Sequence, residues 1–250
     1  MPVDSEIIIL VDGQTFSQAG FDFILEGVAQ AFEQQSFIDS VASGSVGSIA
    51  ASVSIFNSTG TSTAIPWIEL SSASDLQGFA DSVRDVALPP SFGPISYVDA
   101  ISSAAASIAT SATEGALRQV TIVEDGSFFF FDDTAAEIRA ERDAALASSA
   151  DVINAVVFNA AGAARTAAID DFYTENVVGG EPGGEVDVIG GSFFGAPASP
   201  VIAEAIQSSI VATITQPTVD AGALTVVPES STAFLGVFSL ATLMVRRRRC

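Results

Sequence analysis

Glu6–Val11 reads EIIILV, and this short stretch decides how the rest of the chain is interpreted. Its five consecutive apolar residues are mostly β-branched, and the run is too short for a typical helix, so we expect a strand. A continuous apolar run without alternation indicates a strand that is buried on both faces, as in parallel sheets covered by helices. Asp12 and Gly13 follow it directly and mark a turn.

Helix-like and strand-like segments alternate along the chain after this strand. Further strands are expected at Ser45–Asn57, Thr61–Glu69, Gln119–Val123, Val152–Phe158 and Val186–Ile189. The first two would form a hairpin through Ser58-Thr59-Gly60. Helices are expected at Phe16–Phe32, Ser74–Ala87, Ile95–Ala112, Asp133–Ser148 and Pro200–Ile214. This order predicts an α/β sandwich with a mostly parallel central sheet.

The composition excludes several classes of protein. The 250 residues include 30 acids and 9 bases, for a net charge of −21, and 48% are hydrophobic, which argues against intrinsic disorder. All nine bases are arginine, so histidine-based catalysis, imidazole metal ligands, Schiff bases and a phosphate-loop lysine are absent. The excess of acids would repel nucleic acid. The single cysteine, Cys250, cannot form a disulfide within the chain.

The charges are distributed unevenly between the body and the end of the chain. Residues 1–227 hold 5 bases and 29 acids, whereas residues 228–250 hold 4 bases and 1 acid. We therefore expect an acidic domain over residues 1–216, a linker over 217–227 and a distinct tail over 228–250.

The tail combines Pro228-Glu229, an uncharged apolar stretch over residues 232–245 and the cluster Arg246, Arg247, Arg248 and Arg249. Fourteen helical residues span about 21 Å, less than the roughly 30 Å hydrocarbon core, so a thin bilayer or flanking serines would have to cover the difference. The arginines should remain on the cytoplasmic side, which places the acidic body outside. The alternative interpretation is an amphipathic or buried helix with a basic end.

This tail resembles the PEP-CTERM sorting signal of Gram-negative bacteria, although Ser230 stands where that signal usually has a second proline. The resemblance implies export, transient anchoring in the inner membrane through residues 232–245, and cleavage by an exosortase-type sorting enzyme. The mature protein would then reach the cell envelope, the surface or the extracellular matrix.

An exported protein also needs a signal peptide with a basic start and a longer apolar stretch. Met1–Glu6 contains two acids and no base, and the apolar run after it has only five residues. We therefore expect that the signal precedes this numbering or that the start is placed too late.

Acidic residues follow two of the expected strands, at Asp12 and at Glu124-Asp125. The carboxyl ends of parallel strands meet at one edge of the sheet, where ligands of such folds bind. Carboxylates at that edge could hold Mg²⁺ or another divalent cation, which takes oxygen ligands. Alternatively, Asp12 and Asp125 are turn residues, and Asp12 caps the following helix.

The architecture over residues 5–215 resembles the von Willebrand factor A domain, and more narrowly a bacterial von Willebrand A-like family of unknown function. The stretches Asp170–Gly180 (DDFYTENVVGG) and Arg142–Ala147 (RDAALA) carry the narrower resemblance.

The resemblance implies a metal-ion-dependent adhesion site (MIDAS), built from an Asp-x-Ser-x-Ser turn, a later threonine and a second aspartate. Asp12 and Asp125 match the two aspartates. Gln14 and Phe16 replace the serines, and Ile95 replaces the threonine. Thr15 and Ser96 lie beside the matching positions and could supply oxygen. The resemblance therefore implies a degenerate MIDAS.

Three functions remain open from the sequence. We favour a non-enzymatic, exported binding module that contacts a protein or polysaccharide through the strand-end face near Asp12, Gly93 and Phe128. The four phenylalanines Phe128–Phe131 would form either an exposed contact surface or buried packing. The alternatives are an envelope hydrolase that uses the pairs Glu124/Asp125 and Asp132/Asp133, and a structural matrix protein without a ligand.

Overall fold

The computed structural model describes residues 1–14, 18–89, 93–124, 131–159, 163–181, 183–190 and 203–209. By its contacts the chain divides into two units, Met1–Gln216 and Pro217–Cys250, and every described residue belongs to the first. The tail motifs Pro228-Glu229 and Arg246–Arg249 lie outside the described residues. The helices in the described ranges include none that is long and apolar enough to cross a membrane.

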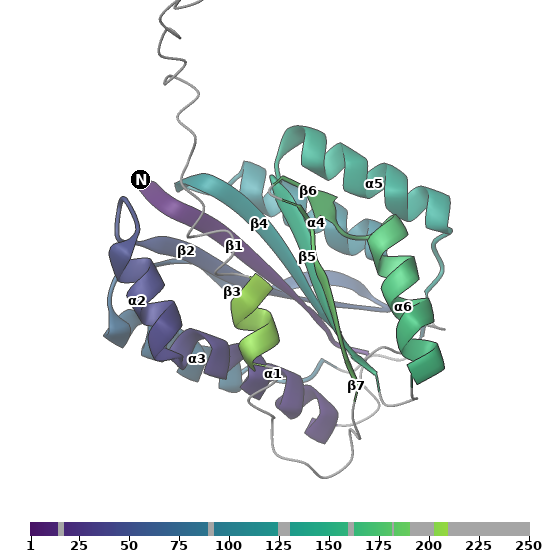
Figure 1. Ribbon diagram of the computed structural model, residues 1–250, viewed down its shortest axis with the longest axis horizontal. Helices are drawn as coiled ribbons and strands as arrows, with labels where there is room; N and C mark the ends of the chain where they lie inside the picture. Colours follow the sequence, from purple (N-terminus) through teal and green to yellow (C-terminus); the bar gives the residue numbers. More distant parts are fainter. Residues whose placement is uncertain are drawn as a thin grey trace, which may run out of the picture. The chain divides into compact units, whose positions relative to one another are not determined.

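The core of the domain is a mostly parallel sheet with strand order β3-β2-β1-β4-β5-β6, and β7 also pairs with β5 (Figure 1). The strands are β1 Pro2–Asp12, β2 Ile49–Asn57, β3 Gly60–Leu70, β4 Glu114–Glu124, β5 Val152–Asn159, β6 Gly179–Gly180 and β7 Val186–Gly190. Only β3 and β6 run antiparallel to their neighbours. The predicted α/β class with a mostly parallel sheet is confirmed.

Helices cover both faces of this sheet (Figure 1). On one face lie α1 Gln18–Glu33, α2 Gln35–Ser43 and α3 Ala73–Arg84, together with the helical residues 203–209. On the other lie α4 Tyr97–Ala109, α5 Ala135–Ser148 and α6 Ala163–Asn176.

The central strand β1 packs against both helical layers. Ile7, Ile9 and Val11 belong to the core under α1, α2 and α3, whereas Ile8 and Leu10 belong to the core under α4, α5 and α6. All five are fully buried. The apolar run therefore forms a strand buried on both sides, as its sequence predicted.

The predicted hairpin joins β2 to β3. The side chain of Asn57 accepts hydrogen bonds from the backbone nitrogen and the hydroxyl of Thr59, and Gly60 adopts a φ of +115°, which favours glycine. Because β3 is the outer strand on this side, its Pro66 removes one backbone donor from an open sheet edge.

Two helices and one strand were not predicted from the sequence. In α2 only Phe37 and Val41 are buried, so a single apolar pair in a polar stretch carries the signal. In α6, Ile169 and Tyr173 are buried. Exposed alanines and acidic residues lie among them, so the apolar face of the helix is hard to recognise in the sequence. Gly179 and Gly180 form the short strand β6, which pairs with β5.

Two polar arrangements fix elements around the sheet. Asp4 accepts hydrogen bonds from Ser45 Oγ at 2.7 Å and from the backbone nitrogens of Val46 and Gly47 at 2.9 and 2.8 Å, which holds the turn before β2. Arg84 at the end of α3 pairs with Glu26 at 2.7 Å and Glu33 at 2.6 Å, both on α1.

Candidate functional site

The carboxyl edge of the sheet carries two carboxylates on neighbouring strands. The pairing of Val11 with Val123 places Asp12 and Glu124 side by side at the ends of β1 and β4. Since side chains alternate along a strand, both carboxylates lie on the face that buries Leu10. Their relative exposures are 0% and 1%, so the pair lies within the protein.

Two phenols meet at the Glu124 carboxylate. The hydroxyl of Tyr97, the first residue of α4, donates to Glu124 Oε2. The hydroxyl of Tyr173, in the last turn of α6, lies 2.6 Å from that of Tyr97. A strand end and the ends of two helices are thereby joined through side-chain oxygens, and both tyrosines are fully buried.

Aromatic rings surround these oxygens. The ring of Tyr97 lies 6.1 Å from that of Phe56 and 5.7 Å from that of Phe131, and Phe172 lies 5.7 Å from Tyr173. Burial, followed by the charge of Glu124, raises the pKa of both tyrosines well above the ordinary value of 10.0. Asp12 adds a smaller effect in the same direction on the pKa of Tyr97.

Ser96, a predicted oxygen ligand, is the N-cap of α4. Its Oγ accepts from the Asp99 backbone nitrogen at 2.9 Å and donates to Asp133 Oδ1 at 3.1 Å. The other oxygen of Asp133 accepts from the backbone nitrogen of Val98 at 3.1 Å. Ile95, at the position of the MIDAS threonine, is buried. The start of α4 is thus closed by its own capping contacts.

Asp12 organises the turn after β1. Its Oδ1 accepts from the backbone nitrogen of Gln14 at 2.7 Å, and the nitrogen of Gly13 donates to the Phe56 carbonyl at 2.9 Å. Asp12 is therefore a turn residue at the end of β1, as one of the two interpretations of the sequence predicted.

Several other predicted site residues lie outside the described ranges. Thr15, Phe16, Asp125 and Phe128 are among them, so the structure describes Asp12 and Ser96 of the four candidate ligands. Within the described ranges, no group of three or more His, Cys, Asp or Glu residues could hold a metal ion.

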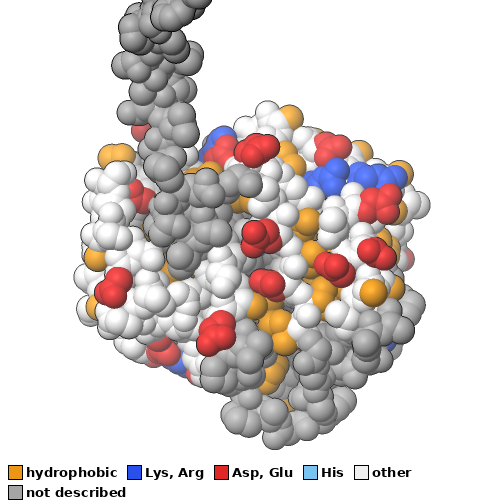
Figure 2. All heavy atoms as spheres, viewed as in Figure 1, with side chains coloured by type: hydrophobic (Ala, Val, Ile, Leu, Met, Phe, Trp, Pro, Cys, Tyr) orange, Lys and Arg blue, Asp and Glu red, His pale blue; other side chains and the backbone are white. Residues whose placement is uncertain are grey.

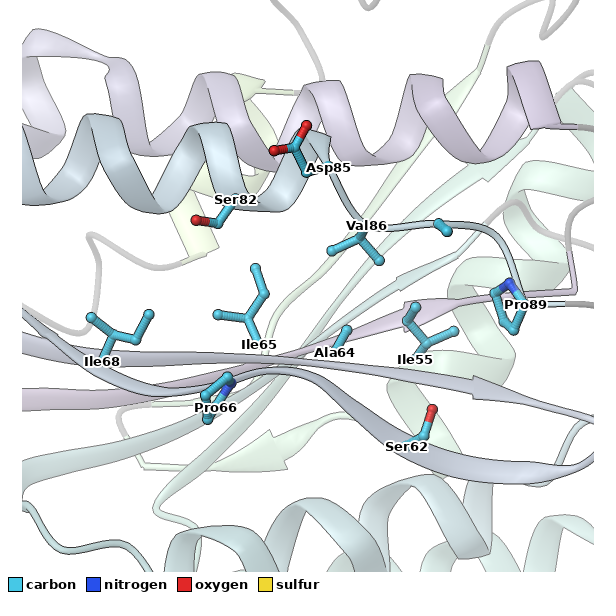
Figure 3. A pocket seen from close by; sticks show the side chains of 11 residues that line it. Ile55, Ser62, Ala64, Ile65, Pro66, Ile68, Ser82, Asp85, Val86 and Pro89 are labelled. Atoms are coloured by element: carbon cyan, nitrogen blue, oxygen red, sulfur yellow. The ribbon is translucent and has the colours of Figure 1, made fainter.

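A hollow of about 650 Å³ lies beside this edge, between the outer strand β3 and the C-terminal end of α3 (Figure 3). Figure 3 shows Ile65 and Ile68 rising from β3 toward Ser82 and Asp85. One end reaches the turn after β1, because Ile55 and Pro89, which line the hollow, are also the nearest neighbours of a Cβ built on Gly13. We call this hollow the β3 groove; its lining is Ile55, Ser62, Ala64, Ile65, Pro66, Ile68, Ser82, Asp85, Val86, Ala87 and Pro89.

The β3 groove is mainly aliphatic and has one charged lining residue, Asp85. On the face shown in Figure 2, carboxylates are scattered across the surface and the basic side chains gather toward its margins. The groove therefore offers a contact of mixed apolar and polar character, with a negative end, on an acidic domain.

Residues 2–188 match a family model described as a protein of unknown function, DUF1194. The chain belongs to the DUF1194 family. Comparison with curated proteins gave no match.

Solved structures similar to this DUF1194 chain include a von Willebrand factor A domain, a matrix protein and a pilus adhesin. Proximal thread matrix protein 1 from the mussel byssus aligns with a TM-score of 0.54 at 13% identity, over 84% of this chain and 48% of that one. The pilus adhesin SpaC from Lactobacillus rhamnosus GG gives 0.56 at 12%, over 85% and 30%. The von Willebrand A domain of SpRpn10 gives 0.53 at 9%, over 84% and 97%.

These likenesses establish the von Willebrand A-like fold. The DUF1194 chain spans about half of the mussel protein and under a third of the adhesin.

The two tyrosines and the inward position of Glu124 were missed in the sequence. A signal existed, because Tyr97 lies four residues before Ile101 on the buried face of α4, and the chain contains only two tyrosines. Tyr97 is 27 positions from Glu124 and 76 positions from Tyr173, so no local sequence pattern shows that these side chains meet.

Proposed function

We propose that this DUF1194 protein is a non-enzymatic binding module that contacts a partner protein through the β3 groove and the adjoining carboxyl edge of the sheet. The observation that carries the proposal is the lining of the groove, which combines aliphatic side chains with polar groups and one carboxylate and is flanked by an outer strand. Apolar grooves beside an open strand suit an extended peptide, which can add main-chain hydrogen bonds to side-chain contacts. The similar structures include a byssus matrix protein and a pilus adhesin, which supports the same class of function.

Several contacts favour binding over hydrolysis. Glycoside hydrolysis needs two carboxylates that reach the substrate from opposite sides. In the described residues, Asp12 and Glu124 are buried, and Asp133 is engaged by Ser96 and by the backbone of Val98. These three acids are thus engaged within the structure.

We further propose that the protein acts outside the inner membrane, carried there by the PEP-CTERM-like tail. The tail sequence supports this, with Pro228-Glu229, the apolar residues 232–245 and four terminal arginines. Mass spectrometry of the mature protein from cells tests it. Loss of the arginine cluster by cleavage after residue 227 is expected, and an intact Cys250 on a protein of the cytoplasmic fraction would refute it.

The binding function is tested by measuring how fluorescently labelled full-length protein binds to isolated envelope and extracellular matrix of the source cells. Ile68 is 38% exposed in the groove, and Ile68→Lys should weaken saturable binding at least tenfold. Val46, 47% exposed in the turn before β2, lies outside the groove, so Val46→Lys is the matched control with the same charge change. Equal binding by both variants and the parent would rule out the groove as the contact surface.

A further inference from the structure

We propose that the carboxyl edge of this domain is closed by phenol hydrogen bonds instead of a divalent cation. In this arrangement Tyr97 and Tyr173 stabilise the buried Glu124 carboxylate beside Asp12, and the domain folds without metal. The proposal concerns the edge that adjoins the proposed binding surface, but it does not depend on the proposed function. It matters because one protein with this fold carries zinc in its MIDAS motif.

The described side chains at this edge do not match the set of ligands of a metal-binding MIDAS. Ile95 contributes a buried apolar side chain where the motif has a threonine hydroxyl. Beside it, the Ser96 hydroxyl donates a hydrogen bond to Asp133 and accepts one from the backbone nitrogen of Asp99. Using Ser96 as a ligand would therefore weaken the N-terminal cap of α4.

The negative charge of buried carboxylates at such an edge is usually balanced by a metal ion. Asp12 and Glu124 are adjacent and fully buried, and burying a carboxylate is costly unless it is paired or hydrogen-bonded. At Glu124 the described donor is a phenol, since Tyr97 donates to Oε2 and Tyr173 continues the chain of hydroxyls. Hydrogen bonds to an ionised acceptor are about twice as strong as neutral ones, so phenols can supply much of the required stabilisation.

On the side of the core, the Glu124 carboxylate lies in aromatic surroundings. Mg²⁺ keeps several of its water molecules when it binds a protein. Around the two phenols lie the rings of Phe56, Phe131 and Phe172, which pack against the tyrosines at centroid distances of 5.7–6.1 Å. An aromatic shell favours a neutral hydrogen-bond donor over a hydrated cation at this position.

The chain offers a convenient spectroscopic probe, because Tyr97 and Tyr173 are its only tyrosines. Any cation that binds beside Glu124 must perturb these phenols and hence the tyrosine difference spectrum. We therefore propose to titrate the metal-stripped, full-length protein separately with Mg²⁺, Mn²⁺ and Ca²⁺, and to follow that spectrum, the heat of binding and the melting temperature.

The expected result is no saturable heat, an unchanged tyrosine spectrum and equal melting temperatures with chelator and with each cation. Tyr97→Phe should lower the melting temperature by several degrees, because Glu124 loses the hydrogen bond that its Oε2 accepts from Tyr97. Trp67→Phe, which removes the indole hydrogen bonds to Ser107 on the same helix, is the control for losing a contact to α4 elsewhere. Saturable metal binding that perturbs the phenols, or an unchanged melting temperature in Tyr97→Phe, would overturn the proposal.

A second variant keeps the test decisive if Tyr97→Phe fails to fold. Glu124→Gln retains an oxygen that accepts from Tyr97 but removes the charge that a cation would need. The proposal is supported if Glu124→Gln folds and its melting temperature, like that of the parent, is unchanged by chelator and by cations. A parent stabilised by a cation, with that stabilisation lost in Glu124→Gln, refutes it, whatever the outcome of the groove experiment.

Discussion

The hydroxyl oxygens of Tyr97 and Tyr173 lie 2.6 Å apart inside the protein, although the two residues are 76 positions apart in the sequence. This contact joins the start of α4 to the end of α6 directly beneath the carboxyl ends of β1 and β4. Through Tyr97 and Tyr173, the carboxylate of Glu124 at the candidate site is linked to both helices.

The first prediction concerns alkaline pH. The pKa of each tyrosine is raised well above 10.0 in the folded protein, by burial and by the charge of Glu124. A group with a raised folded pKa contributes stability that is fully present below its unfolded pKa and is lost as the pH rises above it. We therefore expect unfolding free energy to be insensitive to tyrosine ionisation up to about pH 10 and to fall above it.

Tyrosinate absorbance and far-ultraviolet circular dichroism, followed together against pH, check this prediction. Both tyrosines should ionise in the same step as the loss of helix signal. A phenol that ionises at ordinary pH in a protein that keeps its circular dichroism would show that the cluster is open to solvent.

The second prediction concerns the clamp between α1 and α3. Arg84, whose side chain is 30% exposed, pairs with Glu26 and Glu33, and the pKa of each glutamate is lowered, chiefly by its hydrogen bond from Arg84. Arg84→Gln should cost about 1–2 kcal/mol, since exposed ion pairs contribute up to about 1 kcal/mol each. The cost should appear in urea unfolding at neutral pH.

The ion pairs of Arg84 with Glu26 and Glu33 also make the unfolding free energy depend on pH. Carboxyl groups with a lowered folded pKa contribute stability that is present above their ordinary value of 4.5 and is lost as the pH falls through the folded value. The parent should therefore lose more stability than Arg84→Gln between about pH 5 and pH 3. Arg139→Gln removes a 3.6 Å pair with exposed Glu175 and a hydrogen bond to Asn176 but leaves Glu26 and Glu33 untouched, so it is the control and should keep the parent's loss of stability between these pH values.

Much of this fold could be predicted from local sequence, and the reasons are visible in β1. Ile7–Val11 is apolar at every position, so it required burial on both faces, and the strand is the centre of the sheet. In contrast, α2 buries only Phe37 and Val41, and its helical state depends on packing against the core that the rest of the chain supplies.

The candidate site was predictable only in part. Asp12 follows the strand signal directly, so its place at the carboxyl edge could be predicted. Whether a neighbouring carboxylate points outward or into the core depends on strand register, and the pairing of Val11 with Val123 turns Glu124 inward. Ser96 could be predicted to lie near this edge, but its partner Asp133 is 37 residues away. Sequence spacing alone does not show such a contact.

The third prediction concerns the turn before β2. Burial alone would raise the pKa of Asp4, but hydrogen bonds from Val46, Ser45 and Gly47 more than offset it, and the pKa is lowered. Asp4→Ala leaves these backbone donors without their acceptor and should cost about 1–3 kcal/mol. Ser45→Ala removes one donor and keeps the carboxylate, so its cost should be smaller. Equal melting temperatures for Asp4→Ala and the parent would contradict this role.

The last prediction concerns the close approach of backbone at the candidate site. A Cβ on Gly13 would lie 2.5 Å from Ile55 Cγ2 and 3.3 Å from Pro89 Cγ, so an alanine there requires the side chain of Ile55 to shift. Gly13→Ala should cost about 1–3 kcal/mol through overpacking. Ile55→Ala removes the contacting methyl group, so the double variant should be less destabilised than the sum of the single ones. Chemical unfolding of the four proteins measures this coupling. Strict additivity would mean that the turn and the β3 groove do not share this contact.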